Sequence, residues 1–191
     1  LSKKNMKRIF DLFFCIIIIP IILIPFLLIG LIILFQNDGS ILHWSKRIGE
    51  NNKIFFMPKF RTMKLNTPQL ATHLLKNPNS HITFIGSFLR KTSLDELPQL
   101  YSVLAGKMTI VGPRPALYNQ YDLIEARKNK GIHHLKPGIT GLAQINGRDE
   151  LSIDQKVKFD YEYLLRNSIY FDIKIIIHTL LRVFKNRNIK H

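Results

Sequence analysis

Residues 12–35 read LFFCIIIIPIILIPFLLIGLIILF, and this run decides the fold because none of its 24 side chains is charged. At about 1.5 Å per residue, a helix of this length reaches roughly 36 Å, more than the ~30 Å hydrocarbon core of a bilayer. The run is too long for a cleaved signal peptide, and no small-residue cleavage pattern follows it. The sequence therefore predicts one membrane-embedded segment.

Two features of this segment bear on whether it crosses the membrane. Pro20 and Pro25 each remove a backbone donor and predict a kink near the middle. Basic residues flank both ends, with Lys7 and Arg8 before the run, and the positive-inside bias favours keeping both flanks on the cytoplasmic side. We interpret Lys7, Arg8, Pro20 and Pro25 as membrane-anchoring residues. On these residues alone, a re-entrant hairpin and a spanning helix both stay open.

The charge of the whole chain indicates an anionic partner. Its 191 residues contain 28 Lys and Arg against 13 Asp and Glu, a net charge of +15. The mean hydropathy of +0.04 averages the apolar run with a strongly polar remainder. A disordered chain and a polytopic membrane protein are both excluded, and the single Cys15 excludes a disulfide scaffold. Nucleic acid, an anionic membrane or a phosphate-bearing ligand fits the charge.

Patterning divides the chain into an anchoring segment, residues 1–36, and a polar domain, residues 37–191, which the resemblance described below implies to be on the cytosolic face. Two β-like pieces on either side of residues 49–52 predict a short hairpin, and residues 69–75 a short helix. The last part predicts an amphipathic helix with Ile173, Ile177 and Leu180 on one face. The expected fold class is α+β, mostly helical, with an N-terminal membrane-embedded segment, either a re-entrant hairpin or a spanning helix, and with amphipathic interfacial helices.

Residues 93–104 contain the most informative acidic pair. Leu97, Leu100 and Leu104 recur at helical spacing, which predicts a helix that begins at a Ser93–Glu96 capping box or at Asp95. In the simpler interpretation, Asp95 and Glu96 only cap this helix. In the functional interpretation, the two carboxylates lie beside basic residues, where Mg²⁺ and a diphosphate can meet.

Two later stretches predict anion contacts. Arg114 lies between Pro113 and Pro115, which restrict the backbone and suit a bidentate phosphate contact. Residues 136–148 hold three glycines and end at Arg148, so their backbone amides could cradle an anion.

Several stretches together resemble the bacterial sugar transferases, more specifically the small monotopic polyprenyl-phosphate phosphoglycosyl transferases. The resemblance runs nearly end to end. The matching motifs are Lys7–Asp11, Lys59–Met63, Arg90 with Ser93–Leu100, Val111–Pro115, Lys136–Gly141, Ala143–Arg148 and Asp172–Lys174. One departure is that Ile24–Pro25 stands where the family often has a Ser-Pro pair, and Pro20 is an additional proline.

The resemblance implies transfer of a phosphosugar from a UDP-sugar to polyprenyl (undecaprenyl) phosphate, releasing UMP, as the first membrane step of glycoconjugate assembly. Asp95 would form a covalent phosphosugar intermediate and hold Mg²⁺, the family's cofactor, and Glu96 would assist as a base or metal partner. The implied substrate-binding residues are Lys59, Arg61, Arg90, Pro113, Arg114, Pro115, Gln144, Asn146 and Arg148.

The implied location is the cytoplasmic face of the bacterial inner membrane, with a monotopic attachment to its lipid. This favours the re-entrant arrangement, because a spanning helix with its basic N-terminus inside would place Asp95 on the far side from nucleotide sugars. The alternative is a membrane-tethered, non-enzymatic binder of anionic polymer or nucleic acid. It explains the charge and the anchor but not the Asp95–Glu96 pair beside rigid arginines, so we expect no nucleic-acid partner.

Overall fold

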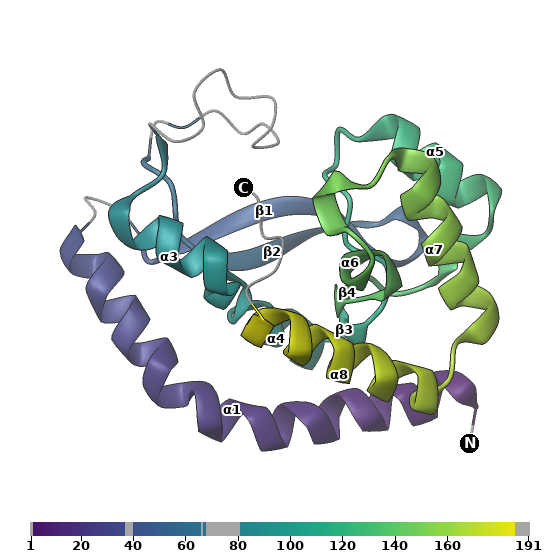
Figure 1. The fold of residues 1–191 in the computed structure, drawn as a ribbon, viewed down its shortest axis with the longest axis horizontal. Coiled ribbons are helices and arrows are strands. Elements are labelled where there is room, and N and C mark those ends of the chain that lie inside the picture. Colours follow the sequence, from purple (N-terminus) through teal and green to yellow (C-terminus); the bar gives the residue numbers. More distant parts are fainter. Residues whose placement is uncertain (1, 37–39, 66, 68–80, 186–191) are drawn as a thin grey trace.

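The computed structural model describes residues 2–36, 40–65, 67 and 81–185. A long helix, α1 (Lys3–Gln36), runs along one side, and the other elements lie within its bend (Figure 1). The rest of the chain forms β1 (Leu42–Ile48), β2 (Ile54–Phe60), α3 (Phe84–Thr92), α4 (Gln99–Leu104), β3 (Thr109–Val111), α5 (Tyr121–Asn129), β4 (Gly138–Thr140), α6 (Leu142–Ile145), α7 (Ile153–Arg166) and α8 (Ile169–Lys185). The mostly helical α+β class is confirmed. The helix predicted at 69–75 lies outside the described residues.

The apolar run forms one continuous helix with Pro20 and Pro25 inside it. The helix bends in its middle part, as expected where prolines remove backbone donors (Figure 1). The run is thus a single bent helix that resumes after each proline, and its re-entrant position in the membrane stays a prediction. It is the one described helix long and apolar enough to cross a membrane.

Helix α1 has a packed side and an exposed apolar side. Cys15, Ile29 and Ile33 are buried against the rest of the chain. The exposed side chains are large and apolar, and between residues 13 and 35 they are Phe13, Ile16, Ile17, Ile21, Leu23, Ile24, Leu27, Leu28, Leu31, Ile32, Leu34 and Phe35. An apolar patch of this extent is typical of a membrane-contacting surface.

The basic residues before the apolar run bind inside the protein. Lys7 donates to Asp172 of α8, which is fully buried, and to the hydroxyl of Tyr163. Arg8 donates to the carbonyls of Val103 and Leu104, at the end of α4, where helical carbonyls lack partners. The sequence interpretation assigned these two residues to the membrane surface and missed their role in docking α1 onto the domain.

Asp11 makes a third polar link between α1 and the domain. Its carboxylate is 2% exposed and accepts hydrogen bonds from the Thr109 hydroxyl (2.7 Å) and from the Ile110 backbone N–H (3.0 Å). The start of β3 is therefore held by a side chain of α1.

Replacing Asp11 by alanine is expected to destabilise the domain. The change leaves two buried donors unsatisfied, which costs about 2–4 kcal/mol and lowers the melting temperature by roughly 5–10 °C. Thermal unfolding in nanodiscs measures the shift, with Asp122→Ala as the control because Asp122 is exposed. Equal melting temperatures for the two variants would show that α1 does not stabilise the domain through this carboxylate.

The predicted β-hairpin is confirmed. β1 and β2 pair antiparallel, with Leu42 opposite Phe60 and Ile48 opposite Ile54, around the turn that the sequence placed at residues 49–52. A second, parallel pair joins β3 to β4. These strands approach closely near Gly112, because a Cβ on Gly141 would lie 2.1 Å from the Gly112 carbonyl oxygen.

The main core lies between α1, the strands and the C-terminal helices. It includes Cys15 of α1, Val111 of β3, Tyr163 of α7 and Ile175 of α8. The predicted C-terminal helix is confirmed as α8, which also links to β4 through a hydrogen bond of 2.6 Å between the hydroxyls of Thr140 and Thr179.

Candidate functional site

Asp95 and Glu96 lie on a single 3₁₀ turn, Leu94–Glu96, between α3 and α4. The predicted capping box is wrong, since the Ser93 side chain makes no capping hydrogen bond and the residue before α4 is Pro98. Ser93 cannot begin a helix here because it is the C-terminal cap of the preceding helix, α3. As that cap, it adopts a left-handed conformation (φ 58°) and changes the direction of the chain. Both carboxylates are thus presented from a tight turn, each about 8% exposed.

Three cationic side chains converge on one oxygen of Glu96. Lys59 Nζ lies 2.7 Å, Arg148 Nη2 3.0 Å and Arg114 Nη1 3.3 Å from Glu96 Oε1. They come from β2, from the turn after α6 and from the segment after β3. Glu96 therefore joins three separate parts of the chain at one point.

The surroundings of Glu96 keep it ionised. Burial alone would raise the pKa of Glu96, but Lys59, Arg114 and Arg148 outweigh it and hold the pKa well below its usual range. A carboxylate with a depressed pKa is a weak base. Its three contacts with Lys59, Arg114 and Arg148 place Glu96 at the centre of the cation cluster.

Asp95 has a different environment. Its Oδ2 lies 3.6 Å from Lys59 Nζ, a longer contact than any of the three made by Glu96. Burial raises the pKa of Asp95, against the opposing charge of Lys59, and the neighbouring Glu96 adds to the rise. Asp95 is thus the carboxylate of the pair with the longer cation contact and with the raised pKa.

Arg114 is positioned by a rigid backbone. The carbonyls of Pro113, Arg114 and Pro115 accept from Gly138 N (2.9 Å), Arg127 Nη1 (2.8 Å) and Arg47 Nη1 (3.2 Å). The predicted rigid presentation of Arg114 is therefore reinforced by hydrogen bonds on every carbonyl of the Pro-Arg-Pro segment.

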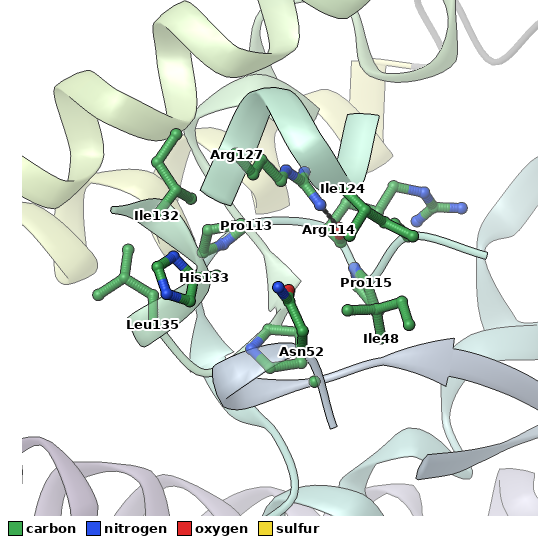
Figure 2. A pocket seen from close by; sticks show the side chains of 13 residues that line it. Ile48, Asn52, Pro113, Arg114, Pro115, Ile124, Arg127, Ile132, His133 and Leu135 are labelled. Atoms are coloured by element: carbon green, nitrogen blue, oxygen red, sulfur yellow. Dashed lines mark hydrogen bonds between the residues drawn. The ribbon is translucent and has the colours of Figure 1, made fainter. Parts of the chain in front are cut away.

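Arg127 acts as a bridge beneath this segment. Its Nε and Nη2 donate to Asp160 of α7 at 2.9 and 2.6 Å, and both side chains are nearly buried. Figure 2 shows Arg127 reaching the Arg114 backbone, while the Arg114 guanidinium points away from the cavity drawn there. The effect of burial on the Asp160 carboxylate outweighs the opposing charge of Arg127, so the pKa of Asp160 is raised. The buried ion pair therefore contributes more to positioning than to stability.

The cavity beneath the segment is small. Its volume is about 30 Å³, and it is lined by Pro113, Arg127 and His133 among others (Figure 2). Ligand pockets for drug-sized molecules measure about 300–1,000 Å³. This cavity therefore has room for about one water and not for a nucleotide sugar.

Arg148 adopts a left-handed backbone conformation with φ 54°. Its Nη1 donates to Ser93 Oγ (3.3 Å), so the two left-handed residues of the site contact each other. Non-glycine residues in this region cost about 1–3 kcal/mol and concentrate at functional sites. The local cost supports a role for Arg148 beyond folding.

The structure brings some of the other predicted residues to the pair and leaves others apart. Arg90 of α3 donates from Nε to Thr62 Oγ1 (3.0 Å). Burial lowers the pKa of Arg90, and the negative charge of Asp95 partly opposes this effect. Arg61 is outside the cation cluster and donates to the Ser40 carbonyl (2.9 Å).

The polar residues of the Ala143–Arg148 motif have contrasting surroundings. Asn146 is exposed and follows α6, and its side chain donates to the carbonyl of Leu142, the first residue of that helix (2.8 Å). Both polar side-chain atoms of Gln144 are buried, with no hydrogen-bond partner among the described residues. Within residues 136–148, the Gly138 amide already donates to the Pro113 carbonyl (2.9 Å), and the anion cradle expected from the other amides of this loop stays a prediction.

The sequence interpretation missed three residues of this region. Asp149 lies 3.6 Å from Arg114 Nε, and Arg47 and Arg127 hold the Pro-Arg-Pro carbonyls. Arg47 and Arg127 gave no signal beyond belonging to a basic chain, because their partners are backbone carbonyls distant in sequence. Asp149 follows Arg148 directly and could have been considered on that ground.

The carboxylates fit a metal ion that is shared with substrate. Within the described ranges, no group of three or more His, Cys, Asp and Glu side chains gathers as a metal cage. Mg²⁺ is commonly held by one or two carboxylates together with substrate phosphates and waters. Asp95 offers one such carboxylate, whereas Glu96 is already occupied by three cations.

The chain is similar to known sugar transferases over nearly its whole length. The family profile described as "Bacterial sugar transferase" matches residues 2–186. The chain is 39% identical over 195 residues to the UDP-glucose:undecaprenyl-phosphate glucose-1-phosphate transferase of Escherichia coli (strain K12), an alignment covering 97% of this chain and 41% of that protein. It is 35% identical over 195 residues to the undecaprenyl-phosphate galactose phosphotransferase of Salmonella typhimurium, covering 93% and 40%.

A shorter relative matches over most of its length. The exopolysaccharide production protein ExoY of Sinorhizobium fredii is 35% identical over 196 residues, covering 95% of this chain and 86% of that protein. The chain thus spans about two-fifths of the Escherichia coli and Salmonella relatives and most of ExoY.

Proposed function

Because the chain belongs to the bacterial sugar transferase family, we propose that it transfers a sugar phosphate from a UDP-sugar to a polyprenyl phosphate and releases UMP. The names of two relatives describe the transfer of a sugar phosphate to undecaprenyl phosphate. The observation that carries the proposal is the contrast within the acidic pair. Asp95 is weakly held beside Lys59, while Glu96 gathers Lys59, Arg114 and Arg148.

The cations of the site offset the charge of a diphosphate. Lys59, Arg90, Arg114 and Arg148 face the pair, and an attacking carboxylate would otherwise be repelled by the anionic substrate. Guanidinium groups bind phosphate oxygens in a bidentate manner, so the arginines both orient the diphosphate and stabilise charge as it moves to the leaving group.

In the first proposed step, an oxygen of Asp95 attacks the β-phosphorus of the UDP-sugar. A bond forms between this oxygen and phosphorus, and the bond from the β-phosphorus to the bridging oxygen breaks. UMP leaves with the bridging oxygen, and the sugar phosphate stays on Asp95 as an acyl phosphate. The raised pKa of Asp95 makes the carboxylate a stronger nucleophile once it is ionised.

In the second proposed step, an oxygen of the polyprenyl phosphate attacks the same phosphorus. The bond between phosphorus and Asp95 breaks, the lipid-linked sugar diphosphate forms, and the carboxylate is regenerated. A two-step exchange lets the water-soluble and the lipid substrates use one site in turn. Mg²⁺, held by Asp95 and the substrate phosphates, would supply Lewis-acid neutralisation of the diphosphate charge.

We further propose that α1 enters and leaves the membrane on the cytoplasmic face of the bacterial inner membrane. Arg8 and Asp11 attach its first turns to the domain, and Ile29 and Ile33 pack against Phe60 and other residues of the same domain near its other end. A helix bound to one polar domain at both ends and exposing an apolar face between them fits a re-entrant position better than a span.

The re-entrant arrangement predicts that both ends of α1 lie on the cytoplasmic side of the membrane. In a Cys15→Ala background, single cysteines at Ser2, Gln36 and Lys130 are all expected to react with a membrane-impermeant maleimide from the cytoplasmic side. Inverted and right-side-out vesicles distinguish the two sides. Labelling of Ser2 and Gln36 from opposite sides would establish a spanning helix and refute the re-entrant proposal.

The activity is tested by a screen for UMP release. The protein in nanodiscs is incubated with individual UDP-sugars, Mg²⁺ and undecaprenyl phosphate, and UMP and the lipid product are measured. At least one UDP-sugar is expected to give equal amounts of both. No UMP release with any UDP-sugar, from protein whose melting transition shows it to be folded, would refute the function.

A further inference from the structure

Arg47 lies on the side of the hairpin that faces the acidic pair. Side chains alternate along a strand, so Arg47 shares a face of β1 with His43, and the exposed side chains Trp44 and Lys46 point the other way. His43 is directly opposite Lys59, which binds Glu96. Arg47 and Lys59 therefore project from the same face of the hairpin.

The contacts of Arg47 differ from those of the cations that bind the acidic pair. Its Nε donates to Ser45 Oγ (3.1 Å) and its Nη1 to the Pro115 carbonyl (3.2 Å), both neutral acceptors. In the part of the chain that the structure describes, no carboxylate lies within ion-pair distance of Arg47, whereas Lys59, Arg114 and Arg148 each contact Glu96.

The electrostatic surroundings of Arg47 are unfavourable to its charge. Burial and the neighbouring Arg114 together lower the pKa of Arg47 to about 10, and the charges of Glu96 and Asp149 only partly oppose them. A half-buried cation without a paired anion is costly, and its charge is compensated only if an anion binds there. The Pro115 carbonyl fixes the guanidinium beside Arg114 without neutralising it.

We propose that Arg47 binds a phosphate oxygen of a substrate, next to Arg114. The proposal rests on the function proposed above, because that function supplies the phosphate. The charge count agrees with it. Arg47, Lys59, Arg114 and Arg148 exceed the three carboxylates Asp95, Glu96 and Asp149 by one positive charge, opposite in sign to a bound diphosphate.

The phosphate has two possible sources, the diphosphate of the UDP-sugar and the phosphate of the lipid. The test compares Arg47→Gln, which keeps a neutral hydrogen-bond donor, with Arg47→Lys, which keeps the charge. Arg166→Gln is the matched control, because Arg166 is exposed and paired with Glu162 on α7. Titration calorimetry with UDP measures donor binding without turnover, and steady-state kinetics give KM for undecaprenyl phosphate.

Loss of a charge-assisted contact is expected to weaken binding about 10- to 100-fold in Arg47→Gln and less in Arg47→Lys, with the melting temperature within about 3 °C of wild type. Weaker UDP binding assigns the donor diphosphate, and a raised lipid KM with unchanged UDP binding assigns the lipid phosphate. Unchanged UDP affinity and unchanged lipid KM would overturn the proposal.

Two further results are informative. If Arg47→Gln loses its melting transition, Arg47→Lys decides. A folded Arg47→Lys protein with wild-type UDP affinity, wild-type lipid KM and more than about 10-fold lower kcat would indicate a structural role and overturn the proposal. Wild-type protein that neither binds UDP nor releases UMP would instead overturn the proposed function on which the inference rests.

Discussion

An Asp95→Asn protein is expected to release UMP at a rate on the order of 10⁴-fold or more below wild type, because the amide cannot form the acyl phosphate. The substitution keeps the size of the side chain and removes its charge. The Glu96 contacts to Lys59, Arg114 and Arg148 involve a different side chain, so UDP binding is expected to survive. The measurement is initial-rate UMP release at saturating UDP-sugar and lipid, with UDP affinity measured in parallel.

The matched control for this variant is Asp154→Asn, an exposed carboxylate in the first turn of α7. It is expected to retain wild-type turnover, because removing one favourable charge at a helix start costs only tenths of a kcal/mol. Turnover by Asp95→Asn within about tenfold of wild type would mean that another group is the nucleophile.

A Glu96→Gln protein is expected to lose activity on the order of 10²- to 10³-fold in kcat/KM near neutral pH. Glu96 is the one acceptor shared by Lys59, Arg114 and Arg148, and a neutral amide cannot hold three cations at one oxygen. The cations then repel one another, and the diphosphate loses its arranged partners.

The same variant is expected to change the pH dependence in a defined direction. Asp95 must be ionised to attack, so the rate falls as the pH drops below the Asp95 pKa. Glu96 is one of the charges that raise this pKa, and replacing it with glutamine removes that contribution while Lys59 stays positive. The acid limb of the kcat/KM profile should therefore move to lower pH.

The pH profile is compared with that of Glu162→Gln, which removes an exposed carboxylate on α7 and is expected to superimpose on wild type. A Glu96→Gln limb that stays in place or moves to higher pH would contradict the assignment of Asp95 as the group that must be ionised, or of Glu96 as its charged neighbour.

Much of the fold was predictable because its signals are local. Twenty-four uncharged residues predict the membrane helix, and turn residues between two short apolar pieces predict the β1–β2 hairpin. The C-terminal helix follows from apolar spacing. The capping box failed because Ser93 ends one helix as well as preceding the next, and α3 was not anticipated from its pattern.

Contacts between distant residues were beyond a local analysis. From the sequence, Lys7 and Arg8 are interpreted as the basic flank of a membrane segment, and Asp11 only as part of a family motif. The three residues bind α8, α4 and β3, which are 95 to 165 residues away along the chain. A membrane flank and a docking site need the same residue types. Only the fold shows that α1 is part of the domain and not a detachable anchor.

The residues of the candidate site that belong to the sequence motifs could be predicted. Asp95, Glu96, Lys59, Arg114 and Arg148 meet as the resemblance implied. The pattern could not divide the roles within the acidic pair, because the division arises from which carboxylate the cations reach. Residues that hold backbone carbonyls, such as Arg127, carry no motif at all.

The central claim is that Asp95 takes the sugar phosphate before the lipid acts, and it is tested most directly without the lipid. Protein in nanodiscs free of polyprenyl phosphate is mixed with Mg²⁺ and a UDP-sugar labelled at the β-phosphate. The account predicts a burst of UMP approaching one equivalent per active site, with the label bound to the peptide that contains Asp95 and absent from Asp95→Asn. Turnover that yields UMP only when polyprenyl phosphate is present, with no label on the protein, would contradict it.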